Sequence, residues 1–247
     1  MRRIGFSTGA LALGDFARAL EMLRGRAVEV VELSALRESE LQPLRAAVDG
    51  LDLGQFRHVA VHAPGRIAQR HEGAVVDQLR GLAARGWPIV VHPDAVHDWA
   101  LWQQLGTHLL VENMDRRKDI GRTAADLQGV FDQVPAAGLC FDVGHARQCD
   151  TSMTEAYLIL TRLGERLRQV HLSEVTSRSA HDRLSYSSIL AMREVAELIP
   201  EHIPIVLETP VSADEIDDEL TRAHAALPLP APSTQARCEL LARWART

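Results

Sequence analysis

The chain has 247 residues, of which 46% are hydrophobic and 24% charged, and its formal net charge is −6. This amount of apolar side chain is enough to build a large core, so intrinsic disorder is excluded. The acidic balance argues against a protein that binds nucleic acid mainly through phosphate contacts.

Neither export nor membrane insertion is expected. No window approaches the roughly 18 uninterrupted apolar residues that a membrane-spanning helix needs. Two arginines follow the first methionine, but no small-residue cleavage site precedes Asp15, so we expect no signal peptide. Three cysteines (Cys140, Cys149 and Cys238) are too few for a disulfide framework. The expected location is therefore the cytoplasm.

Short apolar runs recur eight times along the chain, and their starts lie 20 to 36 residues apart. This spacing is close to the length of one unit made of a strand, a loop, a helix and a second loop. Runs that are almost continuously apolar are typical of parallel strands covered on both faces. The predicted strands are Arg3–Phe6, Val28–Leu33, Val59–Ala63, Ile89–His92, Leu109–Asn113, Gly138–Asp142, Arg168–Leu172 and Pro204–Glu208.

The segments between these runs have helical periodicity, because apolar residues recur on one face. Ser212 and Asp150 stand where helix-capping residues are expected. The apolar faces are Phe16, Leu20 and Leu23; Val75, Leu79 and Leu82; and Val195, Leu198 and Ile199.

Eight alternating strands and helices predict an α/β fold, a single (β/α)8 TIM barrel. A doubly wound open sheet is the alternative, but no G-x-G-x-x-G follows the first strand and no P-loop is present. We expect one domain over residues 1–247, with the barrel in about 1–226 and a short extension in 227–247. A helix from Gln235 to Arg246 is expected to pack on the outside. An open sheet, or a domain boundary between Ala125 and Val134, would contradict this architecture.

The carboxyl ends of the strands are where a TIM barrel carries its functional groups. Six consecutive predicted strands, the third to the eighth, deliver a His, Asp or Glu to this rim, which is narrow enough for the side chains to converge. Bare charges gathered there would be costly, whereas neutral imidazoles and ionised carboxylates are ligands for divalent cations. The residues are His62, His92, Glu112, Asp142, His145, His171, Glu174 and Glu208.

Histidines elsewhere have simpler structural explanations, because they precede strands on the opposite face or lie in helical stretches. This group contains His58, His108, His202, His97 and His224. His71 opens a helix near the functional face and is a weak candidate for a substrate contact.

Glu32, on the second strand, has two open interpretations: a hydrogen-bond acceptor behind the site or a simple rim residue. Asp115 and the cluster Arg116, Arg117 and Lys118 are interpreted as a solvated loop. Cys140 is expected in the core of a strand.

In strand order, these residues resemble the metal ligands of the xylose-isomerase-like TIM-barrel superfamily. That superfamily groups sugar isomerases and epimerases with the endonuclease IV type of zinc phosphodiesterase. Its shared ligand set is a Glu, an Asp, a His and a Glu after strands five to eight. The matching positions are Glu112 in VENM, Asp142 in FDVGH, His171 in VHLSE and Glu208 in VLETP. The resemblance runs from the first predicted strand to the eighth and implies a metal-dependent TIM-barrel enzyme.

The endonuclease IV type has additional ligands, and three histidines of this chain match them: His62 in VHAP, His92 in VVHPD and His145 in DVGH. It also carries an Asp-x-His pair after strand seven for a third metal. This chain has His181 directly followed by Asp182 instead, so the resemblance leaves a third metal open, and His181 or Asp182 is a candidate to hold it together with His145. The long basic loops with which the endonuclease penetrates DNA are not apparent.

Hydrolysis of a small phosphoester is one reaction that these residues would support, with two or three metals clamping the attacking and leaving oxygens. Glu112 would then bridge two metals. Three arginines on rim loops would contact a phosphate or remain solvated: Arg147, Arg178 and Arg183.

Isomerisation or epimerisation of a sugar or sugar phosphate is the alternative, and it needs only the four shared ligands. Glu112 and Glu208 would act as acid and base through an enediolate. A non-catalytic binding module is a third class. The additional histidines favour a multi-metal site, and therefore hydrolysis.

The expected cofactors are one to three divalent metal ions per chain, zinc first, with manganese, iron or magnesium as alternatives. The expected partner is a small-molecule substrate, with or without a phosphate group. Nucleic acid and membrane partners are not expected, and a homo-oligomer is compatible with the sequence.

Overall fold

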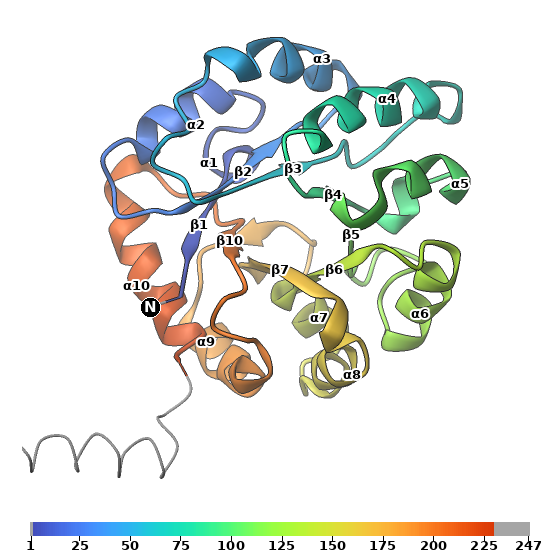
Figure 1. Ribbon diagram of the computed structural model, residues 1–247. Helices are drawn as coiled ribbons and strands as arrows, with labels where there is room; N and C mark the ends of the chain where they lie inside the picture. The colour runs from blue at the N-terminus through green and yellow to red at the C-terminus, as the bar shows by residue number, and fades with distance from the viewer. Residues whose placement is uncertain (1, 230–247) are drawn as a thin grey trace, which may run out of the picture.

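A closed barrel of eight parallel strands forms the centre of the computed structural model, which describes residues 2–229 (Figure 1). The strands are hydrogen-bonded in the order β1-β10-β7-β6-β5-β4-β3-β2. They are β1 (Ile4–Ser7), β2 (Val30–Ser34), β3 (His58–His62), β4 (Ile89–Val91), β5 (Leu109–Glu112), β6 (Gly138–Asp142), β7 (Leu167–Leu172) and β10 (Ile205–Leu207). A separate antiparallel ribbon consists of β8 (Glu174–Val175) and β9 (His181–Asp182).

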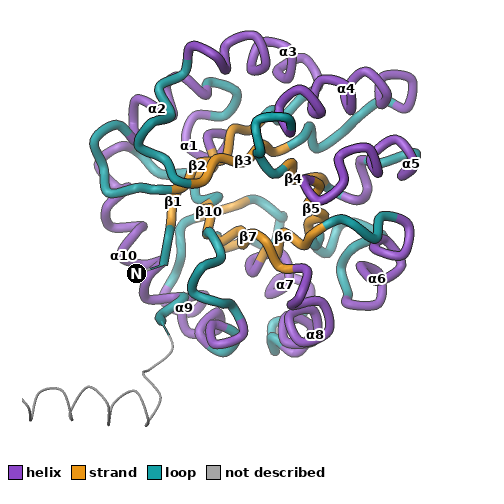
Figure 2. Tube along the Cα trace, in the orientation of Figure 1, coloured by secondary structure: helices purple, strands orange, loops and turns teal. Residues whose placement is uncertain are grey.

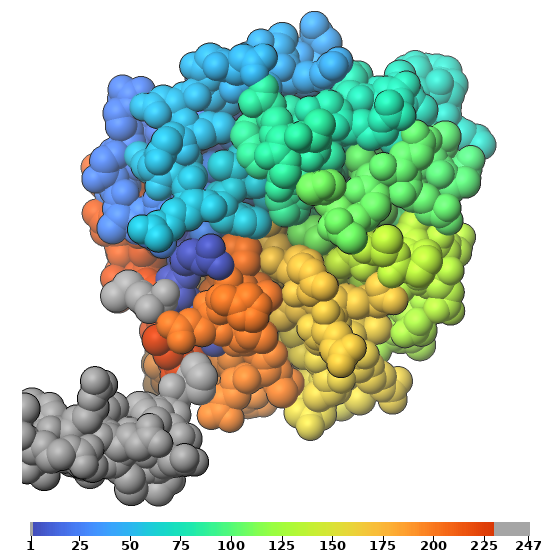
Figure 3. Space-filling model, in the orientation of Figure 1, coloured from blue at the N-terminus to red at the C-terminus, as the bar shows by residue number. Residues whose placement is uncertain are grey.

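Helices surround this barrel on the outside, and the chain passes around it in sequence order (Figures 2 and 3). They are α1 (Thr8–Ala12), α2 (Phe16–Leu23), α3 (Glu38–Ala47), α4 (Glu72–Ala83), α5 (Trp99–Trp102), α6 (Ala124–Gln133), α7 (Val143–Cys149), α8 (Thr154–Leu163), α9 (Tyr186–Arg193) and α10 (Ile216–Ala226). Within residues 2–229, no helix has the length and apolar character required to span a membrane.

The predicted barrel is confirmed, and the open-sheet alternative is excluded. All eight predicted strands are present with ends displaced by at most two residues, and the segment 125–134 belongs mostly to α6. The predicted cap at Ser212 is present, since Ser212 forms a capping box with Glu215. The N-cap of α8 is Met153 rather than Asp150, although the Asp150 carboxylate accepts from the backbone N–H of Glu155 in the first turn of that helix. The expected helix Gln235–Arg246, with Cys238, lies outside the described residues.

One helical prediction is wrong, because the apolar face at 195–199 does not continue α9. That helix ends at Arg193, and a short 3-10 turn at Ala196–Leu198 follows it. The next residue, Ile199, is extended (φ −97°, ψ 109°), as expected immediately before Pro200. The apolar residues there are nevertheless buried against the core.

Alternate residues of each strand face the barrel axis, and the others pack under the helices. Val90, Leu110 and Cys140 form a small apolar cluster that is separate from the main helix–strand core. Two positions further along their strands, in the same inward register, stand His92, Glu112 and Asp142. The period of the strands therefore delivers these polar side chains to one end of the barrel interior.

The close approach of β1 to β2 depends on Gly5. A β-carbon at this position would lie 1.6 Å from the carbonyl oxygen of Val30. Because that oxygen belongs to the backbone of the neighbouring strand, a side chain at Gly5 could be accommodated only by moving the strands apart.

We expect Gly5→Ala to lower the free energy of unfolding by about 3 kcal/mol or more, because the overpacked β-carbon would strain the barrel. Gly129→Ala is the matched control, since a β-carbon on this exposed glycine of α6 meets nothing within 4 Å. It should raise stability by about 0.5–1 kcal/mol. Urea unfolding measures the free energy of unfolding of both variants. Equal stability of the Gly5→Ala variant and the native protein would show that β1 and β2 do not need a glycine where they approach each other.

Candidate metal centre

Glu112 lies at the middle of a buried polar cup at the ends of the barrel strands, and its side chain is inaccessible to solvent. Its Oε2 is 3.1 Å from Nε2 of His62 and 3.3 Å from Nε2 of His92. Its Oε1 is 3.3 Å from Nδ1 of His171 and 3.4 Å from Nδ1 of His145. One carboxylate therefore faces two pairs of imidazoles, one pair on each oxygen.

The four residues matching the shared superfamily set are brought together around Oε1. Ligand atoms of Glu112, Asp142, His171 and Glu208 all lie within 4.8 Å of one another. Three buried atoms of this group have no hydrogen-bond partner: Glu112 Oε1, Asp142 Oδ2 and His171 Nδ1. Unpaired buried polar atoms are rare, and three facing one another fit a cation between them. A set of three carboxylates and one imidazole suits zinc, manganese, iron or magnesium.

Three further groups of potential ligands adjoin this one. The first consists of His62, His92 and Glu112, and the second of Asp142, His145 and His181, again with ligand atoms within 4.8 Å. The third, Glu32, His62, His171 and Glu208, overlaps the others, and its Glu32 Oε2 already accepts from His171. Glu112 and Asp142 each belong to two of the remaining three groups, so those three sites would share carboxylates.

Of the two candidates after strand seven, His181 reaches the cup and Asp182 does not. His181 on β9 is bonded through Nδ1 to the Ser173 hydroxyl at 2.8 Å, and its Nε2 lies 3.7 Å from Oε2 of Glu208. The exposed Asp182 accepts the backbone N–H of Arg183 and belongs to no candidate metal group among the described residues.

Backbone carbonyls orient two of the imidazoles. Nδ1 of His62 donates to the carbonyl of Ala63 at 2.7 Å, and Nδ1 of His145 donates to the carbonyl of Asn113 at 3.0 Å. A proton held on Nδ1 leaves Nε2 as the ligand atom of each ring. In His62 this Nε2 faces Glu112, whereas in His145 the nitrogen that faces Glu112 is the protonated Nδ1.

His171 is oriented by Glu32, which is the buried acceptor behind the site rather than a rim residue. Glu32 Oε2 accepts from Nε2 of His171 at 3.0 Å and from Nε2 of Gln169 at 2.6 Å. Gln169 Oε1 in turn accepts from Nε2 of His58 at 2.9 Å. His58 enters the barrel from the opposite end, as predicted, but its ring belongs to this interior chain of hydrogen bonds, which the sequence interpretation missed.

The pKa values of several side chains in the cup favour their protonated forms, although the same side chains are potential metal ligands. Burial lowers the pKa of His62, but its hydrogen bond to Glu112 and the nearby carboxylates outweigh burial and raise that pKa to about 9. Burial also opposes protonation of His145, but the charges of Asp142 and Glu112 raise its pKa to about 10. Burial raises the pKa of Asp142 to about 6. Cations and protons therefore compete for the same donors.

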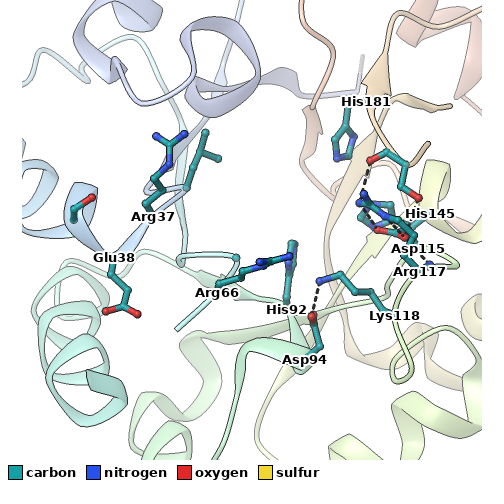
Figure 4. A pocket seen from close by; sticks show the side chains of 14 residues that line it. Arg37, Glu38, Arg66, His92, Asp94, Asp115, Arg117, Lys118, His145 and His181 are labelled. Carbon is teal, nitrogen blue, oxygen red and sulfur yellow. Dashed lines mark hydrogen bonds and ion pairs between the residues drawn. The ribbon is translucent and has the colours of Figure 1, made fainter. Parts of the chain in front are cut away.

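A cavity of about 970 Å³ opens over the cup, and cationic side chains gather around it (Figure 4). Lys118 is paired with Asp94, and Arg117 with Asp115 at 3.1 Å. Arg66 extends into the cavity and has no carboxylate partner within residues 2–229. Arg37, paired with Glu40, and Glu38, which accepts from His71, stand further out on the wall.

The loop that follows β5 is not merely solvated, and this corrects the sequence interpretation. Asp115 is 3% exposed and accepts hydrogen bonds from Arg117 and from the Ser179 hydroxyl. Burial alone would raise the pKa of Asp115, but these hydrogen bonds lower it to about 2. The loop is therefore anchored, and it holds Arg117 and Lys118 at the wall of the cavity.

The three arginines that the sequence offered for phosphate lie outside the lining of this cavity. The Arg183 guanidinium is paired with Glu215, Asp218 and Glu219 of the final helical segment, at 2.5, 2.6 and 3.3 Å. Arg147 faces Glu174 at 3.8 Å, and Arg178 is exposed. Arg66 and Lys118, which line the cavity, were missed, although both follow barrel strands and the strand-end rule could have included them.

Comparison with known proteins agrees with this architecture. Residues 98–220 match the family model described as Xylose isomerase-like TIM barrel. Endonuclease IV from Thermus thermophilus has a similar structure (TM-score 0.63), with 21% identity over 91% of this chain and 98% of that one. No curated protein matches the sequence.

Two further solved structures show the same fold. A putative sugar phosphate isomerase/epimerase from Anabaena variabilis has a TM-score of 0.56 and 14% identity, over 90% of this chain and 88% of that one. A xylose isomerase-like TIM barrel protein from Mycobacterium smegmatis, in complex with magnesium, has a TM-score of 0.56 and 16% identity, over 92% of this chain and 98% of that one. At these identities the likeness concerns the fold.

Replacing Glu32 by Gln should weaken divalent metal binding by roughly 10- to 100-fold, because the neutral amide supports the His171 imidazole less well than a carboxylate. Chelator competition measures the affinity. Glu155→Gln is the control, since this carboxylate accepts from the backbone of Ala124 on the outside of the barrel. Equal metal affinity in the two variants would show that Glu32 has no influence on the site.

Proposed function

We propose that this chain, a xylose isomerase-like TIM barrel, is a divalent-metal-dependent hydrolase of a small phosphoester that uses more than one metal ion. The observation that carries the proposal is the position of Glu112. Its Oε2 faces Nε2 of His62 and of His92 at 3.1 and 3.3 Å, and its Oε1 faces Nδ1 of His171 at 3.3 Å, as a bridging carboxylate would. A single-metal site needs neither His62 nor His92, yet both rings are turned into the cup.

Three metal positions follow from the donor groups once the group that contains Glu32 is set aside, because Glu32 is already hydrogen-bonded to His171 and Gln169. Their chemistry fits zinc well because imidazoles contribute to each. Such cations, when bound, activate a water molecule and neutralise the charge of phosphoryl oxygens. The positions are His62, His92 and Glu112; Glu112, Asp142, His171 and Glu208; and Asp142, His145 and His181.

The surrounding side chains would bind and orient the phosphate group. Arg66 is free to make a bidentate contact with two phosphate oxygens, and Lys118 supplies a point charge beside it. The cavity is an open concavity lined by loops that follow several strands, which suits a small molecule. The net charge of −6 disfavours duplex DNA as the substrate.

Metal-dependent isomerisation or epimerisation of a sugar or sugar phosphate is the second candidate. It is supported by the presence of all four residues of the shared set, Glu112, Asp142, His171 and Glu208. In this set, Glu112 and Glu208 lie 3.3 and 3.5 Å from the same nitrogen of His171. Both carboxylates could then serve as acid and base on adjacent substrate carbons. This reaction would leave His62 and His92 without a metal.

Metal counting on the purified protein separates the two reactions. We expect two or three equivalents of zinc in the native protein, because the donor groups offer that many positions. His62→Ala and His92→Ala should each lose about one equivalent and lower phosphoester hydrolysis at least 100-fold, since the bridging arrangement needs both cations. His202→Ala, an exposed histidine at the opposite end of the barrel, is the control.

The hydrolase proposal would be contradicted if the native protein bound one equivalent of metal and the His62→Ala and His92→Ala variants bound the same amount. Interconversion of an aldose and a ketose by the metal-loaded enzyme, with no phosphoesterase activity, would establish the second candidate instead.

A further inference from the structure

A second cavity, of about 330 Å³, lies on the side of β1, β2 and β10. It adjoins the first cavity, the one of about 970 Å³ that is lined by Arg66 and Lys118. The two cavities share four lining residues, Leu36, Gly65, His92 and His181, so they are continuous over the metal cup. His62 and Glu208 also line the second cavity. A ligand that fills both cavities would therefore cross directly over the candidate metal ligands.

The outer wall of this second cavity is apolar. It is formed by Ala10 in α1, Leu13 directly after α1, Leu36 after β2, Ala63 after β3 and Pro210 after β10. We call this set the apolar wall.

Two serines also line the cavity, but their hydroxyls are engaged. Ser7 Oγ and Ser34 Oγ are bonded to each other at 2.8 Å, and the Ser34 backbone N–H donates to the hydroxyl of Thr8 at 2.9 Å. Their mutual bond uses one of the two hydroxyl hydrogens, so the side away from the metal cup presents apolar surface and few free hydrogen-bonding groups. A strongly polar ligand group placed there would lose more hydrogen bonds to water than it could regain.

The apolar wall also exposes two large side chains to solvent. Leu13 is 73% exposed and Leu36 is 39% exposed. Leu13 has φ +54° and ψ −121°, a backbone conformation that side-chain-bearing residues rarely adopt. Such strain is typically retained near functional sites. When a ligand covers exposed leucines at the edge of a cavity, the burial of their apolar surface contributes favourably to the free energy of binding.

We propose that the apolar wall binds an apolar ring of the substrate, so that the phosphoester is an aryl or similarly apolar ester rather than a sugar phosphate. This inference rests on the proposed function. The phosphate lies beside Arg66 and Lys118 in the first cavity, and the ring lies against Leu13 and Leu36 in the second. The ester bond between them is then positioned over the metal cup.

Binding of two phosphonates tests the proposal without requiring turnover. Phenylphosphonate and methylphosphonate carry the same anionic group but differ in the ring. Isothermal titration of the zinc-loaded protein should give at least roughly 10-fold tighter binding of phenylphosphonate, because the ring buries apolar surface on the wall. The double variant Leu13→Gly, Leu36→Ser should narrow this preference to within about two-fold.

The variant is chosen to fold, since glycine relieves the positive φ at position 13. Leu190→Ser is the matched control, because Leu190 is a 43% exposed leucine on α9 that lines neither cavity. It should keep the full preference for phenylphosphonate.

Equal affinity of the native protein for the two phosphonates would overturn this inference and leave the proposed hydrolase intact. The inference would also fail if the double variant kept the full preference. If neither phosphonate binds and the zinc-loaded protein cleaves no phosphoester, the proposed function fails, and the inference fails with it.

Discussion

The carboxylate of Glu112 is completely buried, and the arrangement of the barrel end follows from the need to compensate its charge. A bare carboxylate in such a place costs several kcal/mol, which a protein tolerates only when opposite charge is supplied. Four imidazoles within 3.4 Å can carry protons or share cations. Backbone carbonyls and Glu32 fix the orientation of three of these rings, so that one nitrogen of each faces the cup. The geometry is thus set before any substrate arrives.

The surroundings of the cup divide into a cationic half and an apolar half. Arg66 and Lys118 stand on the loops after β3 and β5, whereas Leu13 and Leu36 stand on the loops after β1 and β2. A barrel makes such a division easy, because each strand contributes its own loop to a shared rim. The same rim hosts hydrolases and isomerases in related folds, so the reaction must be argued from the site and not from the barrel.

The sequence predicted the barrel and the polar residues at the strand ends because both depend on local patterns, whereas the set of Glu112, Asp142, His171 and Glu208 was singled out by the family resemblance. Strand ends repeat at regular spacing, and inward-facing residues alternate, so Glu112 and Asp142 could be placed from their neighbours alone. Long-range pairing could not be predicted in this way. Asp115 is buried because Ser179, 64 positions later, packs beside it, and Arg183 is diverted from the cavity by carboxylates 32 to 36 positions away. The choice of His181 over Asp182 likewise depends on how the β8–β9 ribbon faces the cup.

In the proposed hydrolase, Glu112 would bridge two cations. Anomalous diffraction from crystals of the zinc-loaded protein tests it directly, because each bound zinc gives its own peak. We expect two peaks on either side of the Glu112 carboxylate, about 3.5–4 Å apart, one beside His62 and His92 and the other beside Asp142, His171 and Glu208. A single peak in the second position, with His62 and His92 contacting no metal at full zinc loading, would contradict this expectation.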